Sequence, residues 1–181
     1  MSSPRQYHNV VLAGFMGTGK SSVGRLIAEE LRFDFVDTDT LIEGRAGKRV
    51  ADIFAQEGEP AFRRHEQQVV EELAERRRAV ISVGGGVIVN PANLASLKSH
   101  SLVVCLWAAP ETIWQRTRAH SHRPLLSGPD PQEKIRSLLA EREPFYRQAD
   151  VLINTDHRNL KEVAHHVLHE FGRVRAQASK T

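Results

Sequence analysis

The stretch GFMGTGKS, from Gly14 to Ser21, decides the fold of this 181-residue chain. It matches the pattern G-x-x-x-x-G-K-[ST], and it stands between an apolar run and an amphipathic segment. Glycines let the backbone wrap around phosphate groups, and the start of the following helix offers free N–H donors and about half a positive charge. The stretch therefore predicts a nucleoside triphosphate site, in which Lys20 reaches the β- and γ-phosphates and Ser21 is a Mg²⁺ ligand.

Short apolar runs alternate with helical patterns along the rest of the chain. The apolar runs lie at residues 8–13, 35–37, 80–83, 102–107 and 151–154. The helical patterns lie at residues 20–32, 61–78, 111–119, 131–149 and 159–173. Strands separated by helices pair in parallel and are covered on both faces, which agrees with these continuous apolar runs. The expected fold class is α/β: a three-layer α/β/α sandwich with a five-stranded parallel sheet, as a single domain over residues 1–181. The polar segment after Gly172 is expected to be frayed.

Composition and charge exclude several classes of protein. Hydrophobic residues make up 40% of the chain and charged residues 26%, as in ordinary globular domains. No apolar stretch reaches the about 18 residues that a transmembrane helix needs. The net charge of +3 permits anionic ligands, but too few aromatic residues accompany the basic ones for a single-stranded nucleic-acid groove. One cysteine, Cys105, allows no intrachain disulfide. We expect a cytoplasmic protein with no nucleic-acid or membrane partner.

A second glycine-rich stretch, SVGGGVIVN from Ser82 to Asn90, follows the third apolar run. Each glycine weakens a regular element by roughly 0.5–1 kcal/mol relative to alanine, so three in a row need a reason. One interpretation is a slack turn. The other is clearance, in which Gly84, Gly85 and Gly86 leave room for a substrate and a transferring phosphate. An ATPase motor would carry Asp or Asp-Glu here, and a GTPase would carry an N-K-x-D motif that this chain lacks.

Two aspartates, Asp37 and Asp39, follow the second apolar run in FVDTDTLIE. One interpretation is that either side chain caps the next helix. The other places the pair at the carboxyl end of a strand, where open α/β sheets bind ligands. There, one carboxylate could help to hold Mg²⁺, and the other could orient a substrate hydroxyl or accept its proton.

Arginines recur in the segments expected above the strand ends. They are Arg63, Arg64, Arg116, Arg118, Arg123, Arg142 and Arg158. Most arginines are solvated surface residues, but the guanidinium fork suits carboxylate and phosphate groups. Residues 119–130, AHSHRPLLSGPD, have little periodicity and follow the fourth strand and its short helix. We predict that this segment is a mobile lid that carries Arg123 over the phosphates.

Six motifs in this order resemble those of the shikimate kinase family, over roughly residues 9–171. They are the phosphate-binding loop, D-T-D at 37–39, F-R-R-x-E at 62–66, G-G-G at 84–86, R-P-L-L at 123–126 and E-R-x-P-x-Y at 141–146. The resemblance implies a nucleoside-monophosphate-kinase-like P-loop fold with strand order 2-3-1-4-5. It also implies a monomeric enzyme that uses ATP and Mg²⁺ to phosphorylate the 3-hydroxyl of shikimate, in chorismate and aromatic amino-acid biosynthesis. Shikimate would bind a segment at about residues 38–66.

The resemblance further implies a role for each matching position. Asp39 would bind shikimate hydroxyls and act as the base or orienting group, with Lys20 and Arg123 as the other catalytic residues. Ser21 and Asp37 would surround Mg²⁺. The shikimate-binding residues would be Asp39, Arg63, Arg142, Gly84, Gly85 and Gly86, with Phe54 and Phe62 as walls. The nucleotide-binding residues would be Gly17, Thr18, Gly19, Lys20, Ser21, Ser22, Arg116, Arg123, Arg158 and Asn159.

Two alternatives stay open at this point. The first is another P-loop kinase of small molecules, such as a gluconate kinase. The second is a nucleotide sensor without catalysis, built on the same fold. The presence of Lys20, Asp39, Arg63 and Arg142 argues against the sensor.

Overall fold

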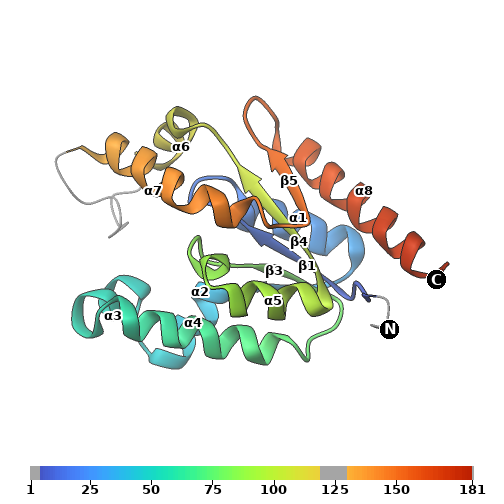
Figure 1. Cartoon of the computed structure of the whole chain (residues 1–181), viewed down its shortest axis with the longest axis horizontal. Coiled ribbons are helices and arrows are strands. Elements are labelled where there is room, and N and C mark those ends of the chain that lie inside the picture. Colours follow the sequence, from blue (N-terminus) through green and yellow to red (C-terminus); the bar gives the residue numbers. More distant parts are fainter. Residues whose placement is uncertain (1–4, 119–129, 181) are drawn as a thin grey trace.

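A five-stranded parallel sheet forms the centre of the structure (Figure 1). The computed structural model describes residues 5–118 and 130–180. The strands are β1 (Asn9–Ala13), β2 (Asp34–Asp37), β3 (Ala79–Ser82), β4 (Ser101–Trp107) and β5 (Val151–Asn154). Every pairing is parallel and the order is β2-β3-β1-β4-β5, which confirms the sheet and the strand order expected from the sequence.

Helices cover both faces of the sheet. On one face, Val10 and Leu12 of β1 belong to an apolar cluster with residues of α1 (Lys20–Leu31) and α8 (Leu160–Ala178). On the other face, Val11 and Ala13 belong to a larger cluster. Its helices include α4 (Glu59–Leu73), α5 (Pro91–His100), α6 (Pro110–Thr117) and α7 (Pro131–Tyr146). Because both faces are buried, successive strand positions are apolar, and the expected three-layer sandwich is confirmed. Within the described ranges, no helix is long and apolar enough to cross a bilayer.

Four helical elements lie outside the patterns found in the sequence. They are α2 (Thr38–Ala46), α3 (Val50–Glu57), α5 and the 3₁₀ helix η1 (Val87–Val89). The helices α2 and α3 are short and bury few side chains, such as Ile42 and Ile53, so a hydrophobic period has too few points to be seen. N-capping residues mark the starts of two of these elements instead: Asp37 caps α2, and Asn90 caps α5.

The C-terminal helix is longer than the sequence indicated. The prediction that the chain frays after Gly172 is wrong, because α8 continues to Ala178. Phe171 is buried on this helix, and the guanidinium of Arg175 lies 5.3 Å from the centre of its ring. A long polar side chain therefore covers an aromatic one, and the helix continues with a solvated outer face.

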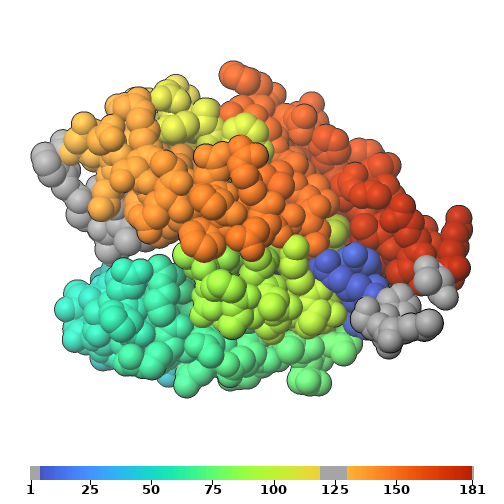
Figure 2. Space-filling view, viewed as in Figure 1, coloured from blue at the N-terminus to red at the C-terminus, as the bar shows by residue number. Residues whose placement is uncertain are grey.

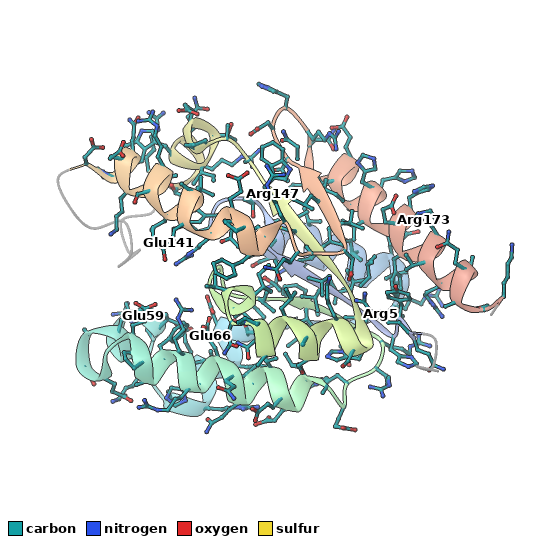
Figure 3. The ribbon with its side chains drawn as sticks, viewed as in Figure 1. Arg5, Glu59, Glu66, Glu141, Arg147 and Arg173 are labelled. Atoms are coloured by element: carbon teal, nitrogen blue, oxygen red, sulfur yellow. The ribbon has the colours of Figure 1, made fainter. Side chains whose placement is uncertain are left out.

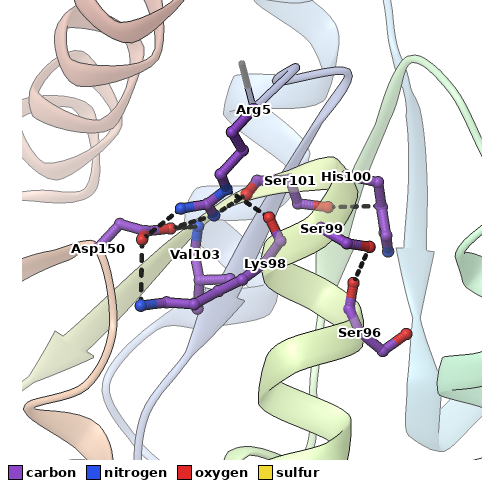
Figure 4. Close-up of polar contacts among 8 residues, drawn as sticks. All are labelled: Arg5, Ser96, Lys98, Ser99, His100, Ser101, Val103 and Asp150. Carbon is purple, nitrogen blue, oxygen red and sulfur yellow. Dashed lines mark hydrogen bonds and ion pairs between the residues drawn. The ribbon is translucent and has the colours of Figure 1, made fainter. Parts of the chain in front are cut away.

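An arginine of the N-terminal segment ties together the amino ends of β4 and β5 (Figure 4). Arg5 donates to both carboxylate oxygens of Asp150, at 2.7 and 2.6 Å, and to the backbone carbonyls of Lys98 and Ser101. The amide of Val103 donates to the same carboxylate at 2.9 Å. Burial would raise the pKa of Asp150, but the hydrogen bonds from Arg5 and Val103 hold it below its usual value. This partly buried, two-pronged ion pair has the geometry in which charge pairs contribute most.

Replacing Arg5 with alanine should lower the free energy of unfolding by about 1.5–3 kcal/mol, because the Asp150 carboxylate would lose its two-pronged partner and stay partly buried. Urea unfolding measures the loss. The matched control is Arg147→Ala, since Arg147 pairs with Glu143 on an exposed helix surface and should contribute less than about 0.5 kcal/mol. Equal losses in the two variants would contradict this account of Arg5.

Candidate active site

A cleft of about 930 Å³ lies at the carboxyl ends of the strands. It is lined by the β1–α1 loop, the ends of β2 and β3, residues of α2 to α4 on one side and Arg142 of α7 on the other. In Figure 2, α3 and α4 (teal to green) lie below α7 (orange), with α5 (yellow-green) between them. Open α/β sheets bind ligands at this edge, and the volume suits ligands of nucleotide size.

The β1–α1 loop has the backbone shape of a phosphate site. Gly14 has a φ of +126°, and a Cβ atom there would lie 2.0 Å from the carbonyl oxygen of Leu106, so no larger residue fits. The buried Thr18 donates its hydroxyl to the carbonyl of Phe15 at 2.8 Å. Any contact of Thr18 with a phosphate would therefore come from its backbone N–H. Lys20 Nζ donates to the carbonyls of Gly14 and Phe15 at 2.9 and 3.0 Å, so its ammonium lies across the loop, beside the start of α1.

Three side-chain oxygen atoms meet at the start of α1. Ser21 Oγ donates to Asp37 Oδ2 at 3.0 Å and lies 3.4 Å from Ser82 Oγ. Asp37 Oδ1 caps α2 by accepting from the amides of Asp39 and Thr40. The capping interpretation of Asp37 is thus realised, and its second oxygen still faces Ser21. Hard oxygen ligands of this kind fit Mg²⁺, which binds through one or two carboxylates, phosphates and water.

Two acidic side chains approach each other at Gly84. A Cβ atom on Gly84 would lie 2.8 Å from Glu66 Oε1 and 3.2 Å from Asp39 Oδ1. Glu66 is 1% exposed, and no described residue bonds to its Oε1. Burial raises the pKa of Glu66 and the charge of Asp39 raises it further, while Arg63 opposes both effects. A buried carboxyl group therefore lies next to Asp39, the predicted base.

Glu66 and Ser82 line the cleft but were not among the predicted site residues. Glu66 ends the F-R-R-x-E motif, three positions after Arg63, and that spacing on a helix is its signal. Ser82 is the last residue of β3, two positions before the first of the three glycines. Its place at the carboxyl end of β3, beside the central strand β1, could have indicated a role in the site.

Two of the arginines that line the cleft, Arg63 and Arg142, differ in their counter-charges. Arg63 is held by two carboxylates of its own helix: Nη1 donates to Glu66 at 2.5 Å, and Nε and Nη2 donate to Glu59 at 3.1 and 2.8 Å. Figure 3 shows Glu59 and Glu66 rising from α4 on the side that faces α7. Arg142 is 7% exposed, and no carboxylate among the described residues pairs with it. Its guanidinium lies 5.6 Å from the centre of the Phe15 ring. A buried cation without a carboxylate in direct contact favours an anionic ligand.

The three glycines after β3 make room for these charged side chains. A Cβ atom on Gly86 would lie 2.4 to 2.7 Å from the guanidinium of Arg63, and one on Gly85 would lie 3.3 Å from Nη1 of Arg142. The glycines thus provide the expected clearance, but they provide it for the charged side chains that line the cleft. The slack-turn interpretation does not explain such close approach on three successive residues.

Two phenylalanines form an apolar wall on the α3–α4 side. The ring centres of Phe54 and Phe62 are 4.7 Å apart, and both residues line the cleft. Phe62 is buried and Phe54 is partly buried against the same core, so a small ring could lie against the pair.

The predicted nucleotide residues divide into three groups. Those that line the cleft are Gly17, Gly19, Lys20, Ser21, Ser22 and Arg116. Arg116 donates to the carbonyl of Gly17 at 3.3 Å and to Thr155, which ties α6 to the phosphate loop. Arg158 bonds to His166 and Asn159 caps α8, and neither lines the cleft, so their predicted contacts with adenine stay predictions. Arg123 and residues 119–129 of the predicted lid lie outside the described residues.

Comparisons with known proteins agree with this geometry. The shikimate kinase family model matches residues 16–171. A shikimate kinase of Symbiobacterium thermophilum is 49% identical over 163 residues, which cover 88% of this chain and 94% of that protein. One from Caldanaerobacter subterraneus is 43% identical and covers 93% of this chain and 99% of its own. The solved structure of the Acinetobacter baumannii shikimate kinase in complex with shikimate has a TM-score of 0.89 and 38% identity, and covers 93% of this chain and 95% of its own. The chain belongs to the shikimate kinase family.

Proposed function

We propose that the cleft holds ATP and Mg²⁺ at the phosphate loop and shikimate between α4 and α7, and that its residues act as described below. The activity is that of the family: transfer of the γ-phosphate of ATP to the 3-hydroxyl of shikimate, giving ADP and shikimate 3-phosphate, a step of chorismate and aromatic amino-acid biosynthesis. The observation that carries the assignment of the substrate site is Arg142, a buried cation that lines the same cleft as the phosphate loop and makes no ion pair with any described carboxylate.

The arginines would hold the carboxylate of shikimate. Arg63 and Arg142 come from opposite sides of the cleft, α4 and α7, and both reach the glycine turn after β3. A guanidinium binds a carboxylate through two parallel hydrogen bonds, which fixes direction as well as position. Because Arg63 is already paired with Glu59 and Glu66, the charge that shikimate brings would be balanced mainly by Arg142. The wall of Phe54 and Phe62 would cover the ring.

Asp39 would act on the hydroxyl groups at the other end of the substrate. Its amide is held by the cap of α2, and one carboxylate oxygen faces Gly84. A positioned carboxylate can orient a hydroxyl and accept its proton as the phosphoryl group arrives. The buried Glu66 lies beside Asp39 at Gly84, and burial raises its pKa while Arg63 opposes that effect.

The phosphate end needs positioning and charge neutralisation more than covalent chemistry. Ser21 and Asp37 would hold Mg²⁺, which neutralises phosphate charge when it is bound. Lys20 would move from the carbonyls of Gly14 and Phe15 to the phosphates, and the N–H groups at the start of α1 would complete the cradle. Arg123 is assigned to the transferring phosphate from the resemblance alone.

We also propose that the chain works as a monomer in the cytoplasm. A single chain supplies both the phosphate loop and the arginines of the cleft, which supports this proposal. The single thiol, Cys105, is buried and free, which suits a reducing compartment.

The activity predicts ADP release that depends on both shikimate and Mg²⁺. A coupled assay of the purified full chain should show turnover with shikimate, loss of turnover after EDTA, and its return when Mg²⁺ is added. Gluconate serves as the matched acid for the alternative kinase. Turnover with gluconate and none with shikimate would refute the proposal, and ATP binding without any turnover would favour the sensor.

Asp39→Asn should lower kcat by about 10²-fold or more, because the amide cannot accept the proton of the hydroxyl. The affinity for ATP should stay within about twofold, as measured by titration calorimetry, since Asp39 does not belong to the phosphate loop. Asp34→Asn, at the amino end of β2, the strand that precedes α2, is the control and should leave kcat unchanged. Near-normal turnover of Asp39→Asn would show that the assigned role is wrong.

Gly86→Ala should raise the KM for shikimate by about tenfold, a loss of about 1.4 kcal/mol, because the new Cβ would displace the Arg63 guanidinium. The KM for ATP should change little. Gly172→Ala is the control, since a Cβ there meets nothing within 4 Å. Steady-state kinetics with each substrate varied would decide. An unchanged KM for shikimate in a folded Gly86→Ala variant would contradict the assignment of Arg63.

A further inference from the structure

In the turn that follows β3, the backbone hydrogen bonds do not fix the orientation of the central peptide group. The amide of Val87 donates to the carbonyl of Gly84 at 3.1 Å and closes a four-residue turn with Gly85 and Gly86 at its centre. Gly84 N–H donates to the Thr38 hydroxyl at 3.2 Å, and the Gly86 carbonyl accepts from Val89 at 3.1 Å. The central peptide, Gly85 C=O with Gly86 N–H, takes part in none of these bonds.

Two turn types, which differ by a flip of about 180° of this central peptide, allow the same hydrogen bond from Val87 to Gly84. Gly86 has φ −103° and ψ −8°, the values of a type I turn. A type II turn requires φ near +80° at this position, which glycine adopts as readily as negative values. The flip would reverse the directions of the Gly85 carbonyl and the Gly86 N–H. With glycine at both central positions, side-chain sterics do not choose between the two forms.

A hydrogen bond from Tyr146 holds the central peptide in the type I orientation. Its hydroxyl donates to the Gly85 carbonyl at 2.7 Å, from the last residue of α7. The side chain is buried, and burial raises the pKa of Tyr146 to about 12, so the hydroxyl keeps its proton in any physiological range. In a trans peptide the C=O and the N–H point in opposite directions. Holding the carbonyl of Gly85 toward Tyr146 therefore turns the N–H of Gly86 away from Tyr146.

The N–H group that Tyr146 orients lies among the substrate-binding groups. Gly85 and Gly86 both line the cleft, and over residues 5–118 and 130–180 no protein acceptor bonds to either N–H. Gly85 lies against Arg142, and Gly86 lies against Arg63. Arg142 precedes Tyr146 by one helical turn, so a single helix places both an arginine and the tyrosine hydroxyl on this turn.

A missing backbone hydrogen bond in α7 makes the hydrogen bond between Tyr146 and Gly85 more important for the position of Tyr146. Pro144 lies inside the helix and has no N–H to give to the preceding turn. The final turn, which carries Tyr146, is therefore held less firmly by its own helix. The hydrogen bond to Gly85 fixes it from outside and joins α7 to the β3–η1 connection.

We propose that Tyr146 is a positioning residue for the substrate: its hydroxyl selects the type I form of the Gly84–Val87 turn and so aims the Gly86 N–H at an oxygen of shikimate between Arg63 and Arg142. This inference rests on the proposed function. Tyr146 itself touches no reacting atom, and it acts through the glycine turn.

Tyr146→Phe keeps the buried ring and removes only the hydroxyl. The KM for shikimate should rise roughly three- to tenfold, the range expected for one hydrogen bond, while kcat and the KM for ATP change less than about twofold. The Gly86 amide should also show microsecond-to-millisecond exchange in ¹⁵N relaxation dispersion, because the central peptide is free to flip. Wild-type protein should show none at this amide.

The chain offers a matched control, since its only other tyrosine is Tyr7, near the amino end of β1. Tyr7→Phe should alter neither KM nor the Gly86 resonance. If Tyr146→Phe is folded by thermal unfolding and has a normal KM for shikimate, or if both substrates lose affinity together, the inference is overturned.

A measurement on the wild type decides the question even if the variant fails to fold. Shikimate should shift the amide resonance of Gly86 more than that of Gly84, which is already bonded to Thr38. No shift at Gly86 would overturn the inference. A wild type that turns over no shikimate would instead refute the proposed function, so the two failures are distinguishable.

Discussion

The parallel pairing of β1 with β3 and β4 is the interaction on which the rest of the structure depends. It brings the carboxyl ends of the strands to one edge, so the loop after β1, the aspartates after β2 and the glycines after β3 open into the same cleft. None of these segments is adjacent in sequence. The register also explains the meeting of Ser82 with Ser21 and Asp37, because Asp37 pairs with Ser82 across the sheet.

Electrostatic balance divides the cleft into two regions. At the phosphate loop lie the ammonium of Lys20, the start of α1 and the carboxylate of Asp37, of which one oxygen caps α2. At the glycine turn, Glu66 sits between Arg63 and Asp39, and its raised pKa shows that burial outweighs the nearby guanidinium. Over residues 5–118 and 130–180, Arg142 makes no ion pair with a carboxylate and feels Glu66 only from a distance. A substrate carboxylate bound to Arg142 would add a direct counter-charge at the end of the substrate remote from the chemistry.

Strong local signals in the sequence predicted the sheet and the phosphate loop, whereas the strand order and the roles of the substrate residues were implied by the resemblance to the shikimate kinase family. Continuous apolar runs, a glycine-lysine loop and paired arginines each depend on short stretches of chain. The helices α2 and α3 were missed because they are short and bury few side chains. Glu66 and Ser82 were missed because their importance comes from neighbours that only the fold supplies. The end of α8 was misjudged because polarity alone does not reveal that Arg175 covers Phe171. The capping and metal interpretations of Asp37 were posed as alternatives, yet its two oxygens point to different partners.

The glycine turn has a consequence for how the protein can evolve. Each of its three Cα atoms lies against a different functional side chain: Glu66 and Asp39 at Gly84, Arg142 at Gly85 and Arg63 at Gly86. A larger residue at any of the three would press against the far end of its partner side chain and shift that group within the cleft. Sequence drift at this turn therefore acts directly on the charged groups of the site, although the glycines carry no charge themselves.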